Sequence, residues 1–182
     1  MTMIVNGGRL RAMAYEALLA RKRRDWTGCG LTAWTLPAEG LAPFQARLTA
    51  WALRKGRAAL FADTGLGKTR MQLAWAANIP GRVLILAPLC VGPQTVAEGA
   101  VIGVPVGETI EITNYERLHH VDPARYTGVV LDESSILKSL DGKTRTRLIA
   151  MFRDTPYRLC CTATPAPNDI AELANHCEFL GI

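Results

Sequence analysis

The stretch that decides the fold is ADTGLGKT, residues 62–69. It follows RAALFA (57–62), which is typical of a short strand, and it leads into a helix predicted over 68–78. Gly65 and Gly67 allow the backbone to curl so that several N–H groups point at one anion. The helix directs its positive end toward the same point. A strand, a glycine-rich turn and a helix in this order predict a phosphate-binding loop.

The side chains that follow the glycines suit a nucleoside triphosphate with magnesium. Lys68 would reach the outer phosphates as a point charge, and Thr69 would offer its hydroxyl to Mg²⁺. The backbone that would surround the phosphates belongs to Thr64, Gly65, Leu66 and Gly67. The strict loop pattern begins with glycine, where this chain has Ala62. An ordinary strand–helix turn with a chance lysine is the alternative, but it does not explain the motifs that follow.

A pair of carboxylates lies downstream, in VVLDESS at residues 129–135. Asp132 and Glu133 come directly after an apolar run, at the carboxyl end of a predicted buried strand, which is where open α/β sheets bind ligands. We expect Asp132 to hold the magnesium, through water, and Glu133 to orient or deprotonate the attacking water. An Asp-Glu pair alone is weak evidence; after a buried strand and downstream of a phosphate loop it is strong.

Strands and helices are predicted to alternate from residue 41 onward. Further strands are expected over 82–87, 111–114, 128–132 and 157–162, and further helices over 43–55, 92–100, 142–153 and 168–180. This alternation predicts an α/β fold, with a parallel central sheet covered on both faces in three layers. Residues 1–40 are different: a basic helical extension over 9–24 ends in RKRR (21–24), and a Gly-, Thr- and Pro-rich linker follows. The domain proper is therefore expected to cover residues 41–182.

Composition sets wide limits on function. The chain has 182 residues, of which 49% are hydrophobic and 20% are charged, as in ordinary globular domains. No apolar run approaches the length of about 20 residues that a bilayer requires, and no signal-peptide core is present, so we expect a cytoplasmic protein without a membrane partner. The five cysteines show no metal-binding spacing and are expected to be reduced. The net charge of +5 is compatible with nucleic acid but is weak evidence by itself.

Several short motifs occur in the order seen in one family of motor proteins. In addition to the phosphate loop and DESS (132–135), they are LAPFQ (41–45), LILAPLCVGPQ (84–94), ITNYE (112–116), TATPAPND (162–169) and HCEFLG (176–181). With these motifs the chain resembles the first RecA-like domain of superfamily 2 helicases, of the DEAD/DEAH-like type. Among them it is most similar to the Swi/Snf-type DNA translocases, particularly the compact versions of phages and bacteria. Helicase phosphate loops commonly accept alanine where this chain has Ala62.

The resemblance implies further site residues. Gln45 would hydrogen-bond the adenine edge and select ATP. The nucleic-acid path would be lined by Pro88, Gln94, Asn114 and Tyr115. Double-stranded DNA is the nucleic acid that the resemblance favours. The element that couples the bound nucleotide to nucleic-acid binding would be Thr162, Ala163 and Thr164. Ser134 and Ser135 replace the usual Ala-His or Ala-Asp, which puts in doubt the contacts of the histidine or aspartate but not the magnesium chemistry.

The resemblance also implies a partner domain. Motors of this kind use a second RecA-like domain, in cis or in trans, whose arginine fingers can raise the rate by about 10³- to 10⁵-fold. None is found in this sequence, so we expect ATP binding with slow hydrolysis by the chain alone. One alternative is a non-catalytic motor half that needs a partner chain. Another is a small-molecule kinase, which would leave Gln45 and TATP unexplained.

Other notable residues have ordinary structural interpretations. Trp51 and Trp75 are expected in the core, as are Cys160 and Cys161 on a buried strand. Tyr115 would either stack on a base or fill the domain edge. The cations expected mainly on a solvated face, with phosphate contact as the alternative, are Lys138, Lys143, Arg145 and Arg147. The residues expected to cap the last helix are Asn168 and Asp169.

Overall fold

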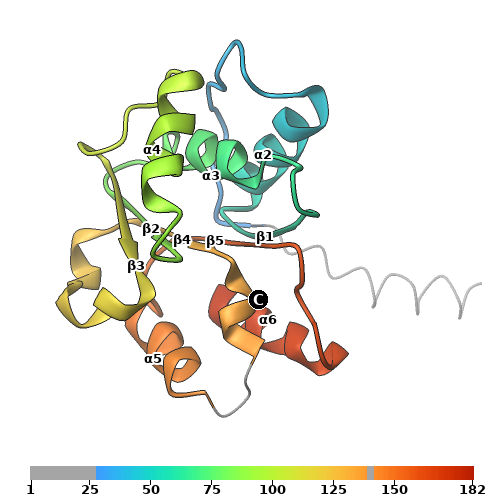
Figure 1. The fold of residues 1–182 in the computed structure, drawn as a ribbon, viewed down its shortest axis with the longest axis vertical. Coiled ribbons are helices and arrows are strands. Elements are labelled where there is room, and N and C mark those ends of the chain that lie inside the picture. Colours follow the sequence, from blue (N-terminus) through green and yellow to red (C-terminus); the bar gives the residue numbers. More distant parts are fainter. Residues whose placement is uncertain (1–27, 139–141) are drawn as a thin grey trace, which may run out of the picture.

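A parallel sheet of five strands forms the centre of the protein (Figure 1). The computed structural model describes residues 28–138 and 142–182, so the helix predicted over 9–24 and its basic cluster lie outside the described residues. The strands are β1 (Arg57–Phe61), β2 (Val83–Ala87), β3 (Ile110–Asn114), β4 (Gly128–Asp132) and β5 (Tyr157–Thr162). They lie in the order β1-β5-β4-β2-β3 and every pairing is parallel. The predicted α/β fold with a parallel sheet is confirmed.

Helices cover both faces of the sheet, as Figure 1 shows. On one face lie α2 (Pro43–Lys55), α3 (Lys68–Ala76) and α4 (Gly92–Val101); on the other lie α5 (Lys143–Met151) and α6 (Leu173–Leu180). Within the described residues, the predicted helices and strands are all present, with ends that differ by a few residues at most, apart from the last helix. There, a 3₁₀ turn over Ile170–Glu172 precedes α6, and Asp169 Oδ1 accepts a hydrogen bond from the Ala171 N–H, so Asp169 caps this turn.

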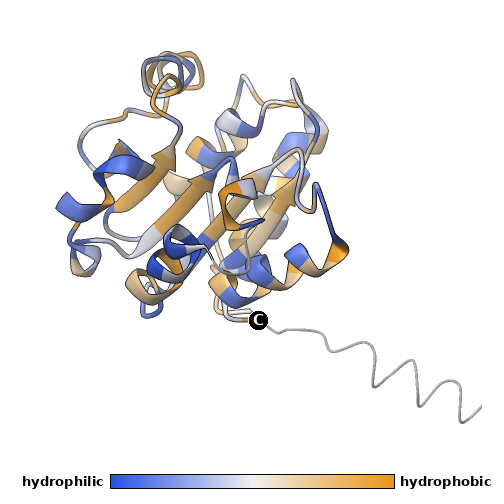
Figure 2. Cartoon of the chain, turned by 60° about the horizontal axis from the view of Figure 1, so that its bottom comes forward, coloured by the Kyte–Doolittle hydropathy of each residue, from blue (hydrophilic) through white to orange (hydrophobic). Residues whose placement is uncertain are grey.

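The strands supply the centre of two apolar clusters, one on each face, and Figure 2 shows the hydrophobic colouring concentrated on them. Because side chains alternate along a strand, Ile85 and Val130 pack toward α2 and α3, whereas Leu86 and Leu131 pack toward α5 and α6. Neighbouring Cys160 and Cys161 are fully buried in opposite clusters, as expected, and burial raises the pKa of both thiols. None of the helices in the described ranges is long and apolar enough to cross a bilayer.

The two helical tryptophans have different environments. Trp75 is 0% exposed in the cluster beneath α3, which confirms the core prediction. The prediction for Trp51 is wrong, because its side chain is 42% exposed. Helix α2 buries Gln45, Thr49, Ala52 and Leu53, and this stripe at spacings of three and four leaves Trp51 beside it.

The segment interpreted as a linker lies along the domain where it is described. Leu31, Trp34 and Leu36 pack against the cluster on the α2 side. The Leu31 N–H donates to the Leu53 carbonyl at 2.9 Å, at the end of α2. Residues 28–40 therefore contribute to the apolar cover of this face, although they form neither helix nor strand.

Candidate nucleotide and nucleic-acid sites

The loop after β1 has the tight curvature that the glycines predicted. Gly65 (φ 79°) and Gly67 (φ 73°) both have left-handed backbone conformations, and Gly67 is the residue immediately before α3. A Cβ atom on Gly67 would lie 2.2 Å from Gln45 Nε2, whereas one on Gly65 would meet nothing within 4 Å. Glycine is thus favoured at position 67 both by the left-handed backbone and by the closeness of Gln45. At position 65 it is favoured by the backbone conformation alone.

Gln45 holds this loop in place. Its side chain is nearly buried, at 8% exposure. Oε1 accepts a hydrogen bond from the Ala42 N–H at 2.8 Å, and Nε2 donates to the Leu66 carbonyl at 2.9 Å. The amide therefore joins the start of α2 to the phosphate loop, a role that the motif alone did not reveal. Its predicted contact with adenine stays a prediction.

A polar cavity of about 460 Å³ opens at the loop and contains most of the residues predicted to bind the nucleotide. Its lining includes Gln45, Gly65, Gly67, Lys68, Thr69 and Asp132. Lys68 Nζ donates to the carbonyls of Ala62 and Asp63, at 2.9 and 3.2 Å. A salt bridge between Arg70 and Glu98 closes the wall on the α4 side. The geometry thus brings a cation and a hydroxyl from α3, and a carboxylate from the end of β4, to one cavity.

Asp132 is a strongly desolvated carboxylate at the end of β4, with 9% of its surface exposed. The Gln72 Nε2 group of α3 donates to its Oδ1 at 2.7 Å. Burial raises the pKa of Asp132 above its ordinary value, as does the neighbouring Glu133 charge; the Gln72 hydrogen bond and Lys68 act in the opposite direction. Sequence reasoning missed Gln72, although its position four residues after Lys68 places both on one face of α3.

Glu133 connects the end of β4 to the end of β5. Its φ of 58° is the only positive value at a non-glycine residue in the described part of the chain, and such strain is common at functional sites. Glu133 Oε1 accepts hydrogen bonds from Ser135 Oγ, at 2.8 Å, and from Thr162 Oγ1. Thr162 Oγ1 in turn accepts from the Thr164 N–H at 3.0 Å. The predicted coupling residues Thr162 and Thr164 are thereby joined to Glu133, with Ala163 between them in the chain.

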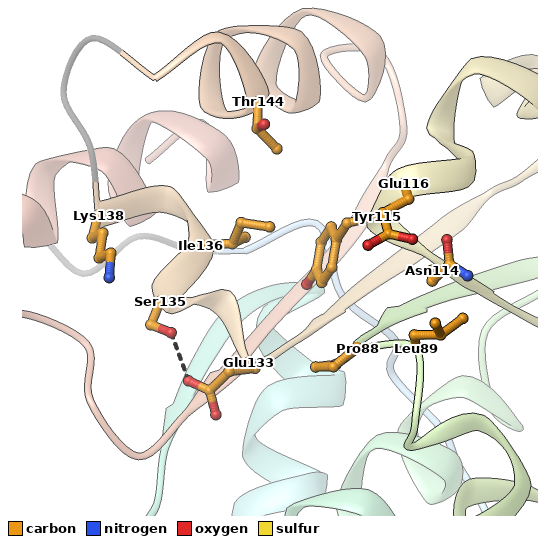
Figure 3. A pocket seen from close by; sticks show the side chains of 10 residues that line it. All are labelled: Pro88, Leu89, Asn114, Tyr115, Glu116, Glu133, Ser135, Ile136, Lys138 and Thr144. Carbon is orange, nitrogen blue, oxygen red and sulfur yellow. Dashed lines mark hydrogen bonds between the residues drawn. The ribbon is translucent and has the colours of Figure 1, made fainter.

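The two serines after Glu133 point in different directions. Ser135 lies beside Glu133, as Figure 3 shows. Ser134 is buried, and its Oγ lies 3.1 Å from His176 Nε2 on α6. Burial lowers the pKa of His176, so the neutral ring is favoured near neutral pH. In this chain a serine–histidine contact ties the segment after β4 to the last helix.

A second cavity of about 600 Å³ has Glu133 in its wall (Figure 3). Its lining includes Pro88, Asn114 and Tyr115, which the sequence assigned to a nucleic-acid path, together with Glu133, Ser135 and Lys138. Gln94, the fourth residue of that assignment, instead lines the first cavity, beside the phosphate loop. The structure thus brings together three of the four residues and separates Gln94 from them.

Tyr115 is anchored within the domain. Its hydroxyl donates to the backbone carbonyl of Asp132 at 2.7 Å, and burial raises the pKa of this phenol. The ring packs against the cluster on the α5 side and also forms part of the cavity wall. Of the two alternatives, filling the domain edge is therefore observed. Among the nearby cations, Lys138 lines the cavity, and Arg145 forms an ion pair with Glu178 on α6.

Comparison with known proteins gives evidence about the fold. No family model matches the sequence, and no curated protein matches it significantly. Among solved structures, the chain is similar to the SWI2/SNF2 ATPase core of Sulfolobus solfataricus in complex with dsDNA, with a TM-score of 0.64 and 20% identity. It is also similar to the UvsW helicase of bacteriophage T4, with a TM-score of 0.63 and 12% identity.

These similarities cover most of this chain but only part of the other proteins. They include 82% and 91% of this chain, and 37% and 64% of the respective neighbours. A second structure of T4 UvsW agrees, with a TM-score of 0.61, 12% identity, and coverage of 91% of this chain and 37% of the other. At such identities the likeness concerns the fold. The chain has the RecA-like α/β fold that these ATPase and helicase structures share.

Proposed function

We propose that this chain binds ATP with Mg²⁺ and hydrolyses it as the first motor domain of a superfamily 2 helicase or translocase acting on DNA in the cytoplasm. The observation that carries the proposal is the meeting of Lys68, Thr69 and Asp132 at one cavity, with Glu133 directly after Asp132. A small-molecule kinase would leave the TATP element (162–165) without a role. The bond that joins Glu133 to Thr162, the first residue of that element, favours a motor.

The residues at the first cavity fit ATP and Mg²⁺ chemically. The left-handed turn at Gly65 and Gly67 brings backbone to the start of α3, where N–H groups and the helix dipole favour phosphate. Lys68 would exchange its two carbonyl partners for phosphate oxygens. The Thr69 hydroxyl and the Asp132 carboxylate are oxygen ligands of the kind that Mg²⁺ prefers. When bound, Mg²⁺ would neutralise charge on the outer phosphates.

Glu133 is positioned to orient the attacking water. Two hydroxyl groups, from Ser135 and Thr162, donate to one of its oxygens and so hold the side chain in one orientation, from which it would accept a proton from water. The Thr164 N–H fixes Thr162 in turn. We infer that a movement of the segment after β5 would shift Glu133, which is how Thr162, Ala163 and Thr164 would couple hydrolysis to DNA movement.

We place the DNA path at the second cavity, which Pro88, Asn114, Tyr115 and Lys138 line. Glu133 lies in its wall, so a ligand there would be close to the hydrolytic residue. Double-stranded DNA is proposed because the SWI2/SNF2 neighbour is a complex with dsDNA. Gln94 does not share this cavity and would instead be close to the nucleotide.

A second RecA-like domain, in cis or in trans, would complete the motor. The described site contains a phosphate loop and two carboxylates, and the neighbours with this fold are longer than this chain. Arginine fingers from such a domain would supply about 10³- to 10⁵-fold in rate. We therefore expect slow turnover by residues 1–182 alone.

The test compares nucleotide binding and ATPase rate, with and without double-stranded DNA, for the chain and two variants. Lys68→Ala should lose binding, whereas Glu133→Gln should retain binding and lose turnover. Arg82→Ala is the control, because it removes a cation that pairs with Glu111 at the opposite, amino end of the strands. Slow turnover that both site variants abolish would support the proposal.

Two other outcomes separate the alternatives. Binding without turnover, with or without DNA, would favour a non-catalytic motor half that depends on a partner chain. Absence of nucleotide binding in the unmutated chain would refute the proposed site. Stimulation by double-stranded DNA would place the nucleic-acid path on this domain.

A further inference from the structure

Helix α3 carries a polar side chain in the middle of its buried face. Gln72 is 0% exposed, and its neighbours Met71, Leu73 and Trp75 are fully buried apolar side chains. Its Nε2 group donates to Asp132 Oδ1 at 2.7 Å. Since Lys68 is four residues earlier on the same helix, one rigid element presents both the phosphate lysine and the partner of Asp132.

Packing alone does not explain a glutamine at this position. Its Oε1 atom is buried and has no hydrogen-bond partner among the described residues. A buried carbonyl without a partner lowers stability, and an apolar side chain of similar volume would avoid this loss. The Nε2 end of the amide faces Asp132, and the side chain also interacts with the Cys161 thiol beside it.

Besides Gln72, the groups that act on the Asp132 carboxylate include the backbone of Glu133, which hydrogen-bonds it, and the charge of Lys68. On the adjacent strand its register partner is Cys161, a buried thiol and therefore only a weak hydrogen-bond donor. Gln72 thus supplies the strong side-chain donor to Oδ1. Because Asp132 lines the first cavity together with Thr69, the bond to Oδ1 determines how its carboxylate faces that cavity.

We propose that Gln72 is a positioning residue that holds Asp132 in the orientation needed to bind Mg²⁺ beside Thr69. This inference rests on the proposed function, because it assigns a support to the same metal site. Residues that hold metal ligands by hydrogen bonds typically contribute about 10- to 100-fold to metal affinity or activity. Gln72 should therefore act on the Mg²⁺-dependent part of nucleotide binding and not on the phosphate loop itself.

The experiment measures binding of a fluorescent ATP analogue, first in EDTA and then as Mg²⁺ is titrated, for the unmutated chain and for Gln72→Met. Methionine has a similar length but cannot donate to Asp132. We expect unchanged binding in EDTA, which also reports an intact fold, and a Mg²⁺ midpoint raised by about 10- to 100-fold. Gln72→Leu serves as a second variant if Gln72→Met does not fold.

Asn175→Leu is the matched control. Asn175 is also a buried amide that donates to a single strong partner, the Leu137 carbonyl at 2.7 Å, and has a carbonyl oxygen without a partner among the described residues. It lies on α6, on the other face of the sheet. Its replacement should leave the Mg²⁺ midpoint unchanged.

The outcomes distinguish the inference from the proposed function. If the unmutated chain binds the analogue and Mg²⁺ strengthens binding, but Gln72→Met keeps the same midpoint, the inference is overturned and the proposed function stands. An equal shift in Asn175→Leu would also overturn it, because the effect would then follow from any lost buried amide. If the unmutated chain binds no nucleotide in either condition, the proposed function fails first.

Discussion

Adding a single methyl group at Gly67 tests how tightly the phosphate loop is held by Gln45. In Gly67→Ala the new Cβ would lie 2.2 Å from Gln45 Nε2, a distance at which one of the two groups must move. Gln45 is nearly buried and makes hydrogen bonds through both ends of its amide, so its displacement would break the contacts to Ala42 and Leu66. The change also forces a non-glycine residue into the left-handed region, at φ 73°.

Two contributions determine how far Gly67→Ala lowers the free energy of unfolding. The left-handed conformation costs about 1–2 kcal/mol for a residue with a Cβ. Loss of two hydrogen bonds adds about 1–3 kcal/mol, at about 0.5–1.5 kcal/mol each. We therefore expect Gly67→Ala to lower the free energy of unfolding by about 2–5 kcal/mol. Gly65→Ala should lower it by only about 1–2 kcal/mol, because its φ of 79° is similar but its Cβ would meet nothing within 4 Å.

The assay is urea-induced unfolding of both alanine variants, alone and combined with Gln45→Ala. Without the Gln45 amide, the effect of Gly67→Ala should fall to that of Gly65→Ala, so the double-mutant cycle should give a coupling of about 1–3 kcal/mol. Equal effects of the two glycine replacements in the unmutated background, or a coupling near zero, would refute the argument that Gln45 holds the loop.

Four further substitutions test other parts of the site and core. Thr162→Val removes a donor to Glu133, and we expect ATP turnover to fall about 10-fold or more while nucleotide binding persists; loss of binding would contradict this. Relative to the unmutated chain, Asp132→Asn should become more stable as pH rises from about 3.8, the ordinary aspartate value, through the raised pKa of folded Asp132. Over this range the unmutated protein must ionise a buried carboxyl, which lowers its stability, whereas asparagine does not titrate. Unfolding at low and neutral pH measures this difference, and a pH-independent effect would show that burial of the charge is not its cause. Trp75→Ala should lower the free energy of unfolding by about 3–5 kcal/mol; Trp51→Ala should lower it by less in urea unfolding, because 42% of the Trp51 side chain is already exposed.

The sequence predicted those parts of the fold that depend on local pattern. The apolar runs at β2 and β4 are buried on both faces, so they are apolar throughout and readily identified as parallel strands. The phosphate loop was equally clear, since glycines at fixed spacing are needed for its left-handed turns. The two carboxylates followed from their place at the end of a buried strand.

The missed features depend on contacts between elements distant in sequence. Gln72 and Asp132 are 60 residues apart, and nothing in either segment alone predicts their bond. Gln45 was recognised by its motif, but its bond to Leu66 depends on how α2 lies against the loop. Trp51 was misplaced because the buried stripe of α2 includes the polar Gln45 and Thr49, which apolar periodicity does not count.

The peptide between Asp132 and Glu133 links the two cavities. Strand alternation directs Asp132, like Val130, toward α3 and the first cavity, while the left-handed φ at Glu133 turns the chain so that its side chain borders the second. The Asp132 carbonyl, which belongs to this same peptide, accepts the hydrogen bond from Tyr115 in the wall of the second cavity. A ligand that displaced Tyr115 would therefore release the carbonyl and allow the strained peptide to rotate, because strain is kept only while its surroundings fix it. Such a rotation would move both proposed catalytic carboxylates together, so that a ligand in the second cavity would change the geometry of the first without contacting it.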